Sequence, residues 1–289
     1  NREQEVAQAS RKAKMVAKEL NIPMFMIDIP FNPDYEVSDA ETEYIKAQFW
    51  DVIHGLEAYT GKKWSDERFK EVMASSGRAS RAWIEATSQA KYVPSPFNGF
   101  DLLNHMAVMV TARGKEEAGD AMETLLKEYK ENHEKGTSTF RAEEKYRIMW
   151  DGIACWPHLA TTFKTLKKYG VNMVASTYPD SWNIRYEKND LDALVRAYAS
   201  HYANRSIAYS VDNIAKIAED YSLDGIIFHS NRSCKLMDFK QYEIQRQVQQ
   251  RTGVPAVFFD GDQTDPRVFS DAQYETRIQA LVELMEKNK

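Results

Sequence analysis

The 289-residue sequence is poor in the residues that most readily reveal a function. It has only two cysteines, Cys155 and Cys234, which excludes a disulfide framework and a four-cysteine metal site built by this chain alone. Its 12 glycines form no dinucleotide- or phosphate-binding motif, and neither a CxxC nor an HExxH motif occurs. No apolar run approaches the roughly 20 residues that span a bilayer. The first residues do not resemble a signal peptide.

The composition describes a globular protein without a polyanionic partner. Hydrophobic residues make up 43% of the chain and charged residues 28%, which is enough apolar material for packed cores. The net charge of −5 argues against binding to nucleic acid or to an anionic membrane. The length is comfortable for two domains. We therefore expect a cytoplasmic protein that binds neither nucleic acid nor membrane.

The second half of the chain alternates between short apolar segments and amphipathic helices. Residues 147–150, 171–176, 225–229 and 255–259 have the length and apolar character of buried strands. Helical spacing occupies residues 159–169, 190–219, 237–251 and 271–287. This order predicts an α/β fold, with a parallel sheet, helices on both faces and right-handed crossovers.

The first half is predominantly helical. A helical pattern over residues 3–20 leads into an apolar run, residues 24–29, which we interpret as a buried parallel strand. Four helices are then expected between Ser38 and about Lys135, the first opened by a capping box of Ser38 and Glu41. We predict three parts: residues 1–37 as the tail of an N-terminal α/β domain, 38–145 as a helical connecting region, and 146–289 as a C-terminal Rossmann-like α/β domain.

Ligands of open parallel sheets bind beyond the carboxyl ends of the strands. The residues that follow the predicted strands are therefore the candidates for function. Both cysteines fall there, with tryptophans and a loop dense in charge. The candidates that we single out are Cys155, Trp156, His229, Asn231, Arg232, Cys234, Lys235, Asp260 and Asp262.

The two cysteines have different surroundings. Cys234 lies between a strand end and a helix start, flanked by Arg232 and Lys235, where the helix dipole and positive charge favour a thiolate. Such a thiolate suits a metal ligand or a reactive group, although a cysteine can also be a small buried hydrophobic residue. Cys155 has apolar neighbours and Trp156 beside it, so we predict that it packs near the site and does not ligate.

The remaining polar candidates allow two interpretations. Asp260, Asp262 and Asp265 could bind a hard cation, although their spacing is not that of an EF-hand. Alternatively, Asp262 or Asp265 caps the following helix and pairs with Arg267 or Arg277. His229, like His158, is predicted to be a hydrogen-bonded structural residue.

Several ordered motifs resemble one family. They are FNGFD (97–101), FRAEEKYRIM (140–149), GIACWP (152–157), NRSCK (231–235), FDGDQTDPR (259–267) and QYETR (273–277). Together they are similar to the α-type subunit of the (R)-2-hydroxyacyl-CoA dehydratases, within the wider group of 2-hydroxyglutaryl-CoA dehydratases and benzoyl-CoA reductases. The resemblance leans toward the 2-hydroxyisocaproyl-, phenyllactyl- and lactoyl-CoA enzymes.

The resemblance implies a hydro-lyase subunit that removes water from a 2-hydroxyacyl-CoA in a syn-type elimination. One electron reduces the thioester to a ketyl radical, which makes the β-hydrogen acidic enough to be removed and leads to a 2-enoyl-CoA. The electron comes from a [4Fe-4S] cluster held by three cysteines. The implied partners are a homologous β-type subunit and a separate ATP-dependent iron–sulfur activator in an anaerobe. We therefore expect no nucleotide on this subunit, consistent with the missing phosphate loop.

Within the resemblance, Cys234 matches a cluster ligand. His229, Asn231 and Arg232 fall around it, where hydrogen bonds and charge could tune a reduction potential. Lys235, Cys155, Trp156, Asp260 and Asp262 are further site candidates, and no catalytic base is assigned.

The sequence departs from the family pattern because no cysteine precedes Cys155. The family places two more cluster cysteines in its N-terminal part, the second about where residues 1–9 stand here. We expect either a chain truncated or altered at its start, or a pairing subunit without its own cluster. Two further hypotheses are a benzoyl-CoA-reductase-like subunit and an enzyme that uses Cys234 as a nucleophile.

Overall fold

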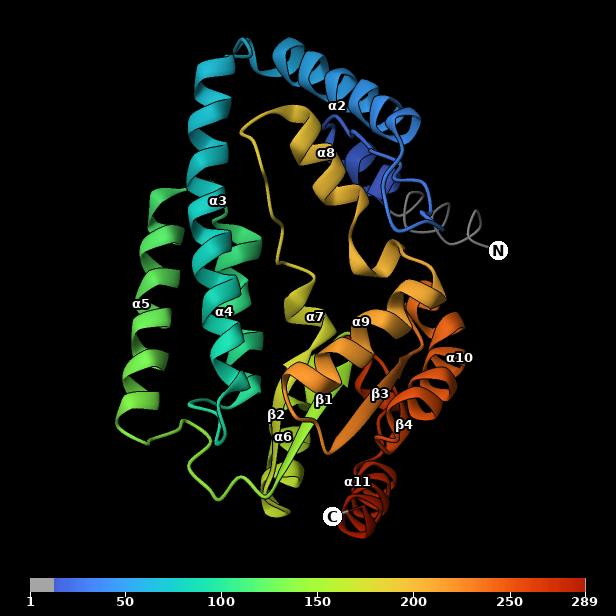
Figure 1. The fold of residues 1–289 in the computed structure, drawn as a ribbon. Coiled ribbons are helices and arrows are strands. Elements are labelled where there is room, and N and C mark those ends of the chain that lie inside the picture. Colours follow the sequence, from blue (N-terminus) through green and yellow to red (C-terminus); the bar gives the residue numbers. More distant parts are fainter. Residues whose placement is uncertain (1–12, 289) are drawn as a thin grey trace.

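The computed structural model describes residues 13–288 and contains a four-stranded parallel sheet. Its strands are β1 (Tyr146–Asp151), β2 (Val171–Ser176), β3 (Gly225–Asn231) and β4 (Ala256–Gly261). They are the four predicted strands, and their spatial order is β2-β1-β3-β4. The α/β prediction is confirmed. The sheet lies in the lower part of the view in Figure 1, with its helices packed around it.

The helices between the strands cover both faces of the sheet. One face packs against α6 (Leu159–Lys168) and α11 (Asp271–Lys287), which contact each other, and the other against α9 (Ile207–Asp220) and α10 (Lys235–Thr252). The chain moves from β1 to β2 by way of α6, and from β3 to β4 by way of α10. These crossovers run in opposite directions from two adjacent strands, so the topological switch point lies between β1 and β3.

The segment between β2 and β3 differs from its prediction. In place of one helix over residues 190–219, the chain forms α7 (Thr177–Asp180), α8 (Leu191–Ala199), a 3-10 turn η3 (Tyr202–Asn204) and α9. The side chains of Asp190 and Ser206 cap α8 and α9 separately by accepting backbone N–H groups. The apolar periodicity of the sequence continues through the break between α8 and α9. The sequence pattern alone therefore could not show that this segment is divided into two separately capped helices.

The helical region is as predicted. It consists of α2 (Asp39–Thr60), α3 (Asp66–Ser88), η1 (Gln89–Lys91), α4 (Gly99–Thr111) and α5 (Glu116–Glu134). The predicted capping box is present, because Ser38 Oγ accepts from the Glu41 backbone and the Glu41 carboxylate accepts from the Ser38 backbone. Figure 1 shows α3, α4 and α5 side by side, and α2 running along α8.

The apolar run over residues 24–29 is not a strand, and this prediction is wrong. The residues form no sheet ladder, and most are exposed or only half-buried. A side chain of α2, and not a neighbouring strand, binds the Asp28 backbone: Gln48 accepts from its N–H at 2.7 Å and donates to its carbonyl at 3.0 Å. An apolar pattern makes a strand only where a neighbouring strand supplies the ladder, and this stretch has none in the part of the chain that the structure describes.

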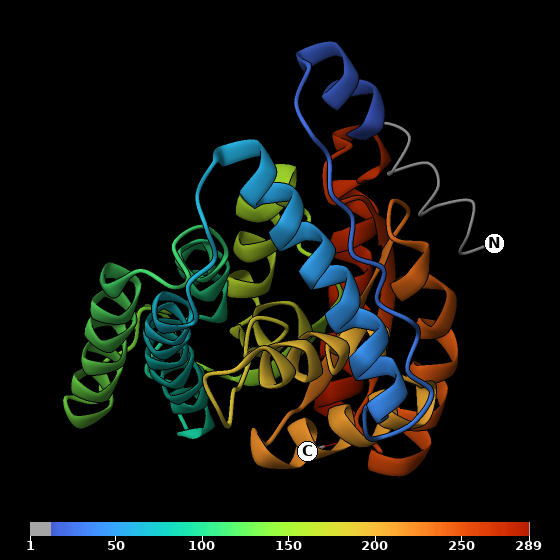
Figure 2. The same ribbon diagram turned by 90° about the horizontal axis from the view of Figure 1, so that it is seen from above.

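The predicted opening helix, residues 3–20, is helical over residues 13–20, and its earlier part lies outside the described residues. Residues 1–9, where the resemblance places a further cysteine, also lie outside them. Figure 2 shows the extended stretch that follows this helix running alongside α2.

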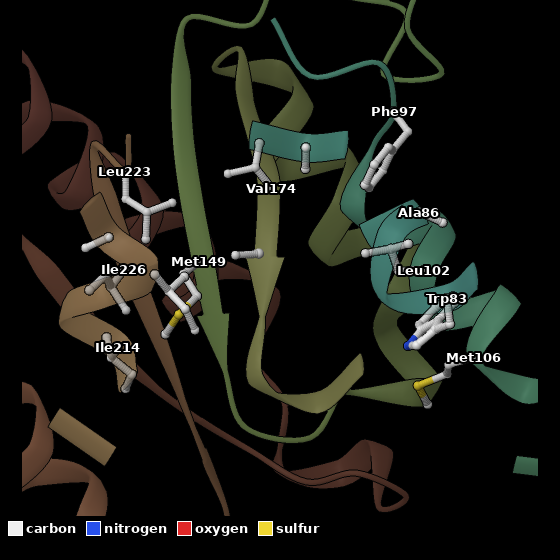
Figure 3. Packing of buried hydrophobic residues seen from close by; sticks show 14 of the residues in the cluster. Trp83, Ala86, Phe97, Leu102, Met106, Met149, Val174, Ile214, Leu223 and Ile226 are labelled. Atoms are coloured by element: carbon white, nitrogen blue, oxygen red, sulfur yellow. The ribbon is translucent and has the colours of Figure 1, made fainter. Parts of the chain in front are cut away.

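The largest core joins the helical region to the sheet. Trp83 and Leu102 of the helical region belong to the same buried cluster as Val174 of β2, and Figure 3 shows Met149 of β1 beside Ile214 and Ile226. The backbone of α4 lies very close to β2, since a Cβ atom on Gly99 would be 2.0 Å from the Met173 carbonyl oxygen. The helical region is therefore fixed against the sheet edge, and the sheet holds the strand ends in place.

Candidate functional site

The residues that the sequence singled out meet at the carboxyl ends of β1, β3 and β4. Cys155 and Trp156 follow β1, His229 and Asn231 are the last part of β3, and Cys234 is the N-cap residue of α10. Because β1 and β3 flank the topological switch point, this is the position where ligands bind in such folds.

Cys155 is fully buried, as predicted, and forms a contact that the sequence did not predict. Its Sγ lies 3.1 Å from Nε2 of His229, which is also fully buried. The other ring nitrogen, Nδ1, lies 2.5 Å from the Ile153 carbonyl oxygen and must carry the hydrogen, since a carbonyl only accepts. Nε2 therefore accepts from the Cys155 thiol.

The protonation of this pair fits that arrangement. Burial lowers the pKa of His229 to about 4 and raises the pKa of Cys155 to about 12. Both groups are neutral at pH 7, so Cys155 is a thiol and not a thiolate. The histidine is a hydrogen-bonded structural residue, as predicted. His158 is one too: its Nε2 donates to the Pro266 carbonyl at 3.2 Å and its ring stacks on Phe269.

Cys234 has a different environment. It is half-buried, and its backbone N–H donates to the Asn231 carbonyl at 2.8 Å, which closes the turn that starts α10. Lys235 is exposed at the first position of the helix. Lys240, further along α10, is buried and close enough to Cys234 to interact with it electrostatically. Cys234 therefore lies at a helix N-terminus near the buried ammonium group of Lys240, a setting that suits a metal-ligating cysteine.

The turn around Cys234 is tied to the loop after β4. The Asn231 side chain donates to Gln263 Oε1 at 3.1 Å and accepts from the backbone N–H groups of Ser233 and Gln263. Ser233 Oγ donates to the Asp262 carboxylate. The position of Cys234 therefore depends on two loops and not on its own segment alone.

The acidic loop is not a cation site in the part of the chain that the structure describes. Asp262 is buried and accepts from the backbone N–H groups of Thr264 and Asp265, while Asp265 caps η4 (Pro266–Val268) and pairs with Arg267. Asp260 pairs with Arg232. No group of three or more His, Cys, Asp or Glu side chains among the described residues could hold a metal ion. The predicted pairing with Arg267 is present, but the capping differs from its prediction: Asp265 caps the 3-10 turn η4, and the helix that follows, α11, is capped by Ser270.

A buried polar network, which sequence reasoning missed, lies under the same strand ends. Asp151, the last residue of β1, is fully buried and accepts from Thr177 Oγ1 at 2.8 Å, Gln241 Nε2 at 2.7 Å and Tyr202 Oη at 3.2 Å. Burial raises its pKa despite these hydrogen bonds. Lys240 neighbours the network, and its Nζ donates to the Arg205 carbonyl at 3.0 Å. The sequence feature that could have revealed this network is Asp151, an aspartate that ends a buried strand.

A cavity of about 910 Å³ opens beside this network. Its wall includes Thr177 and Tyr202, which bind Asp151, and Asp180, whose pKa burial raises to about 7. Arg185 and Lys188, both exposed, lie at its edge. The volume falls within the range of small-molecule sites. Trp156, another predicted candidate, stays partly exposed and packs edge-on against Tyr178.

Comparisons with known proteins agree with the resemblance. The family model described as 2-hydroxyglutaryl-CoA dehydratase, D-component, matches residues 8–285. The (R)-2-hydroxyisocaproyl-CoA dehydratase alpha subunit of Clostridioides difficile is 48% identical over 95% of this chain and 67% of its own length. The (R)-phenyllactyl-CoA dehydratase alpha subunit of Clostridium sporogenes is 47% identical over the same shares. A benzoyl-CoA reductase subunit of Thauera aromatica is 26% identical over 96% of this chain and 67% of its own length.

None of the helices among residues 13–288 combines the length and apolar character needed to cross a membrane. The family match covers nearly the whole chain, and the strands, the cysteines and their loops lie within it. The chain belongs to the 2-hydroxyglutaryl-CoA dehydratase D-component family.

Proposed function

We propose that this chain is a subunit of a 2-hydroxyacyl-CoA dehydratase, a hydro-lyase that forms a 2-enoyl-CoA. Its relatives named as dehydratase alpha subunits are 41–48% identical, whereas the benzoyl-CoA reductase subunit is 26% identical, which favours dehydration over ring reduction. The term alpha subunit in those names supports a partner subunit for this chain. A homologous β-type subunit and an ATP-dependent iron–sulfur activator are the partners that we propose.

The observation that carries the proposal is the position of Cys234. It is a half-buried thiol at the N-terminus of the 18-residue helix α10, next to the switch point between β1 and β3. Cys155 is unsuitable as a second ligand because its thiol is buried and donates to His229. The described residues thus fit one ligand of a [4Fe-4S] cluster and not a whole cluster. The other ligands would be cysteines that are not among residues 1–289, where Cys155 is the only cysteine besides Cys234.

A bound cluster would supply one electron to the thioester, which opens the ketyl-radical route to elimination. The described residues would hold the ligand and orient the substrate. The Asn231 and Ser233 hydrogen bonds fix the turn before Cys234, and the cavity beside Asp151 would receive the acyl-CoA. Arg185 and Lys188 at the cavity edge would bind phosphate oxygens of the coenzyme.

The test is the iron and acid-labile sulfide content of the full-length protein, purified without oxygen together with its partner subunit. We expect about four irons for each cluster and visible absorption from thiolate-bound iron. Cys234→Ser should lose most of this iron. Cys155→Ser is the matched control and should keep it, since a hydroxyl can also donate to His229.

Two outcomes would contradict the proposal. Iron-free wild-type protein would exclude a cluster and support a pairing subunit without one. Equal iron in the wild type and in Cys234→Ser would exclude Cys234 as a ligand. Conversion of 2-hydroxyisocaproyl-CoA and (R)-phenyllactyl-CoA in the presence of the activator then tests the dehydration separately from the cluster.

A further inference from the structure

The loops that follow β1, β3 and β4 meet at one side chain, Cys155. The thiol comes from the first loop and donates to His229 Nε2 on β3 at 3.1 Å. The Asp262 backbone N–H, in the third loop, donates to the same sulfur. The Nδ1–H of the His229 ring donates to the Ile153 carbonyl, in the first loop, at 2.5 Å. These hydrogen bonds join three strand ends that are distant in sequence.

The packing around the pair is tight on two sides. The His229 ring stacks on Phe259, with 4.8 Å between ring centroids and 12° between planes. A Cβ atom on Gly261 would be 2.7 Å from His229 Nε2 and 3.0 Å from Cys155 Sγ. The thiol and the imidazole can therefore meet only because residue 261 has no side chain. The φ angle of Gly261 is not positive, so the backbone conformation does not call for a glycine. The close approach of His229 and Cys155 is the structural reason for a glycine at that position.

The pair is connected to the turn that carries Cys234. Asp262, which donates to Cys155 through its backbone, accepts from Ser233 through its side chain. The Arg232 backbone N–H donates to the Gly261 carbonyl at 3.1 Å. A shift of residues 261–262 would consequently move residues 232–233, directly before Cys234.

We propose that Cys155 is a positioning residue, which acts with His229 to hold the turn at Asn231–Cys234 in the geometry that Cys234 needs. Cys155 binds no metal and reacts with nothing in this role. What matters is a small donor that reaches Nε2 of His229 and also accepts from the Asp262 backbone. A serine hydroxyl can do both and an alanine methyl group can do neither. The reason for this role rests on the proposed function, in which Cys234 is the cluster ligand. The geometry of the turn itself can be measured without cluster or substrate.

The experiment measures the rate at which iodoacetamide alkylates Cys234 in the full-length, metal-free protein, with site-resolved peptide mass spectrometry. We expect Cys155→Ala to raise this rate about fivefold, because loss of one buried hydrogen bond eases local opening. Gly261→Ala should raise it as well, since the added methyl group separates His229 from the thiol. Cys155→Ser should stay close to the wild-type rate.

A second readout concerns the histidine. The ¹⁵N shifts of His229 should report an Nδ1-protonated ring with a hydrogen-bonded Nε2 in the wild type and in Cys155→Ser. In Cys155→Ala the Nε2 shift should move toward that of a nitrogen without a donor. A purely space-filling cysteine would leave this shift unchanged.

The proposal is overturned if Cys155→Ala leaves both the Cys234 alkylation rate and the His229 shifts as in the wild type, even if the variant is less stable. It is also overturned if Cys155→Ser behaves like Cys155→Ala. Neither result depends on iron content, so failure of the positioning role and failure of the cluster proposal are distinguishable.

Discussion

Arg147 and Glu144 form a buried ion pair at the junction of the helical region and the sheet, with side chains only 6% and 4% exposed. Arg147 also donates to the carbonyls of Ala90, Tyr92 and Tyr221, and Glu144 accepts from Asn172 Nδ2 at 2.7 Å. The pair lies in the 140–149 motif and connects η1, the end of α9 and β2. We interpret it as the joint that fixes the helices to the sheet edge.

Removing one member of this pair should be costly. Glu144→Gln leaves the guanidinium buried without its counter-charge, so we expect a loss of about 3–5 kcal/mol in the free energy of unfolding. Urea denaturation measures it. The control is Glu243→Gln on the exposed pair with Arg246, which should cost far less because solvent screens both charges. Equal effects of the two substitutions would show that the buried pair is not a structural joint.

Two helical glycines should respond in opposite ways to a methyl group. Gly99→Ala places a Cβ atom 2.0 Å from the Met173 carbonyl, which cannot move without displacing β2 from α4. We expect a loss of roughly 2 kcal/mol or more in the free energy of unfolding. In Gly77→Ala the nearest atom is the flexible Arg81 guanidinium at 3.2 Å, so helix propensity should make the change neutral or stabilising by up to about 1 kcal/mol. Thermal and urea unfolding of both variants, compared with the wild type, check this contrast, which a destabilised Gly77→Ala would contradict.

His229 should make the protein sensitive to acid. Its pKa is lowered to about 4 by burial, whereas in the unfolded chain it is about 6.5. As the pH falls, the unfolded chain therefore takes up a proton on His229 before the folded protein does. The contribution of neutral His229 to the free energy of unfolding is fully present above pH 6.5. It decreases as the pH drops toward 4, by up to about 3 kcal/mol. His229→Gln should flatten the difference in urea midpoint between pH 7 and pH 4.5. An unchanged pH profile in this variant would show that another group is responsible.

The edge of the cavity should bind the phosphate groups of coenzyme A. Reversal of charge in Arg185→Glu and Lys188→Glu should weaken the binding of free coenzyme A by about tenfold or more each, because charge-assisted hydrogen bonds are lost. Calorimetric titration of the full-length protein at low and high salt measures the loss. Lys164→Glu, an exposed site on α6, is the control for a change in overall charge. If all three variants weaken binding alike, the cavity is not the site.

The sequence predicted most of the scaffold because its signals are local. The four strands are short apolar runs, and the helix at 271–287 begins at the predicted residue, after a capping serine, Ser270. The resemblance rests on contiguous motifs, three of them at the carboxyl ends of strands, and is confirmed by the family match. Cys234 at a helix N-terminus could be predicted from the strand before it and the helical pattern after it.

Other features could not be inferred in this way because they depend on neighbours that are distant in sequence. Residues 24–29 carry a strand-like pattern, but a strand needs a partner and the described residues provide none. The charged loop at 260–265 has the residue types of a cation site, and only the positions of Arg232 and Ser233 show that its carboxylates are already engaged.

The sequence by itself determined the parallel α/β scaffold, the place of the candidate site at the strand ends and the family, since periodicity, caps and motifs are properties of contiguous residues. Only the tertiary structure decided which partner Cys155 has and therefore which protonation state it takes. Burial and the His229 ring, 74 residues away along the chain, make Cys155 a neutral hydrogen-bond donor. Cys234 stays half-buried at the N-terminus of α10, as its flanking sequence predicts.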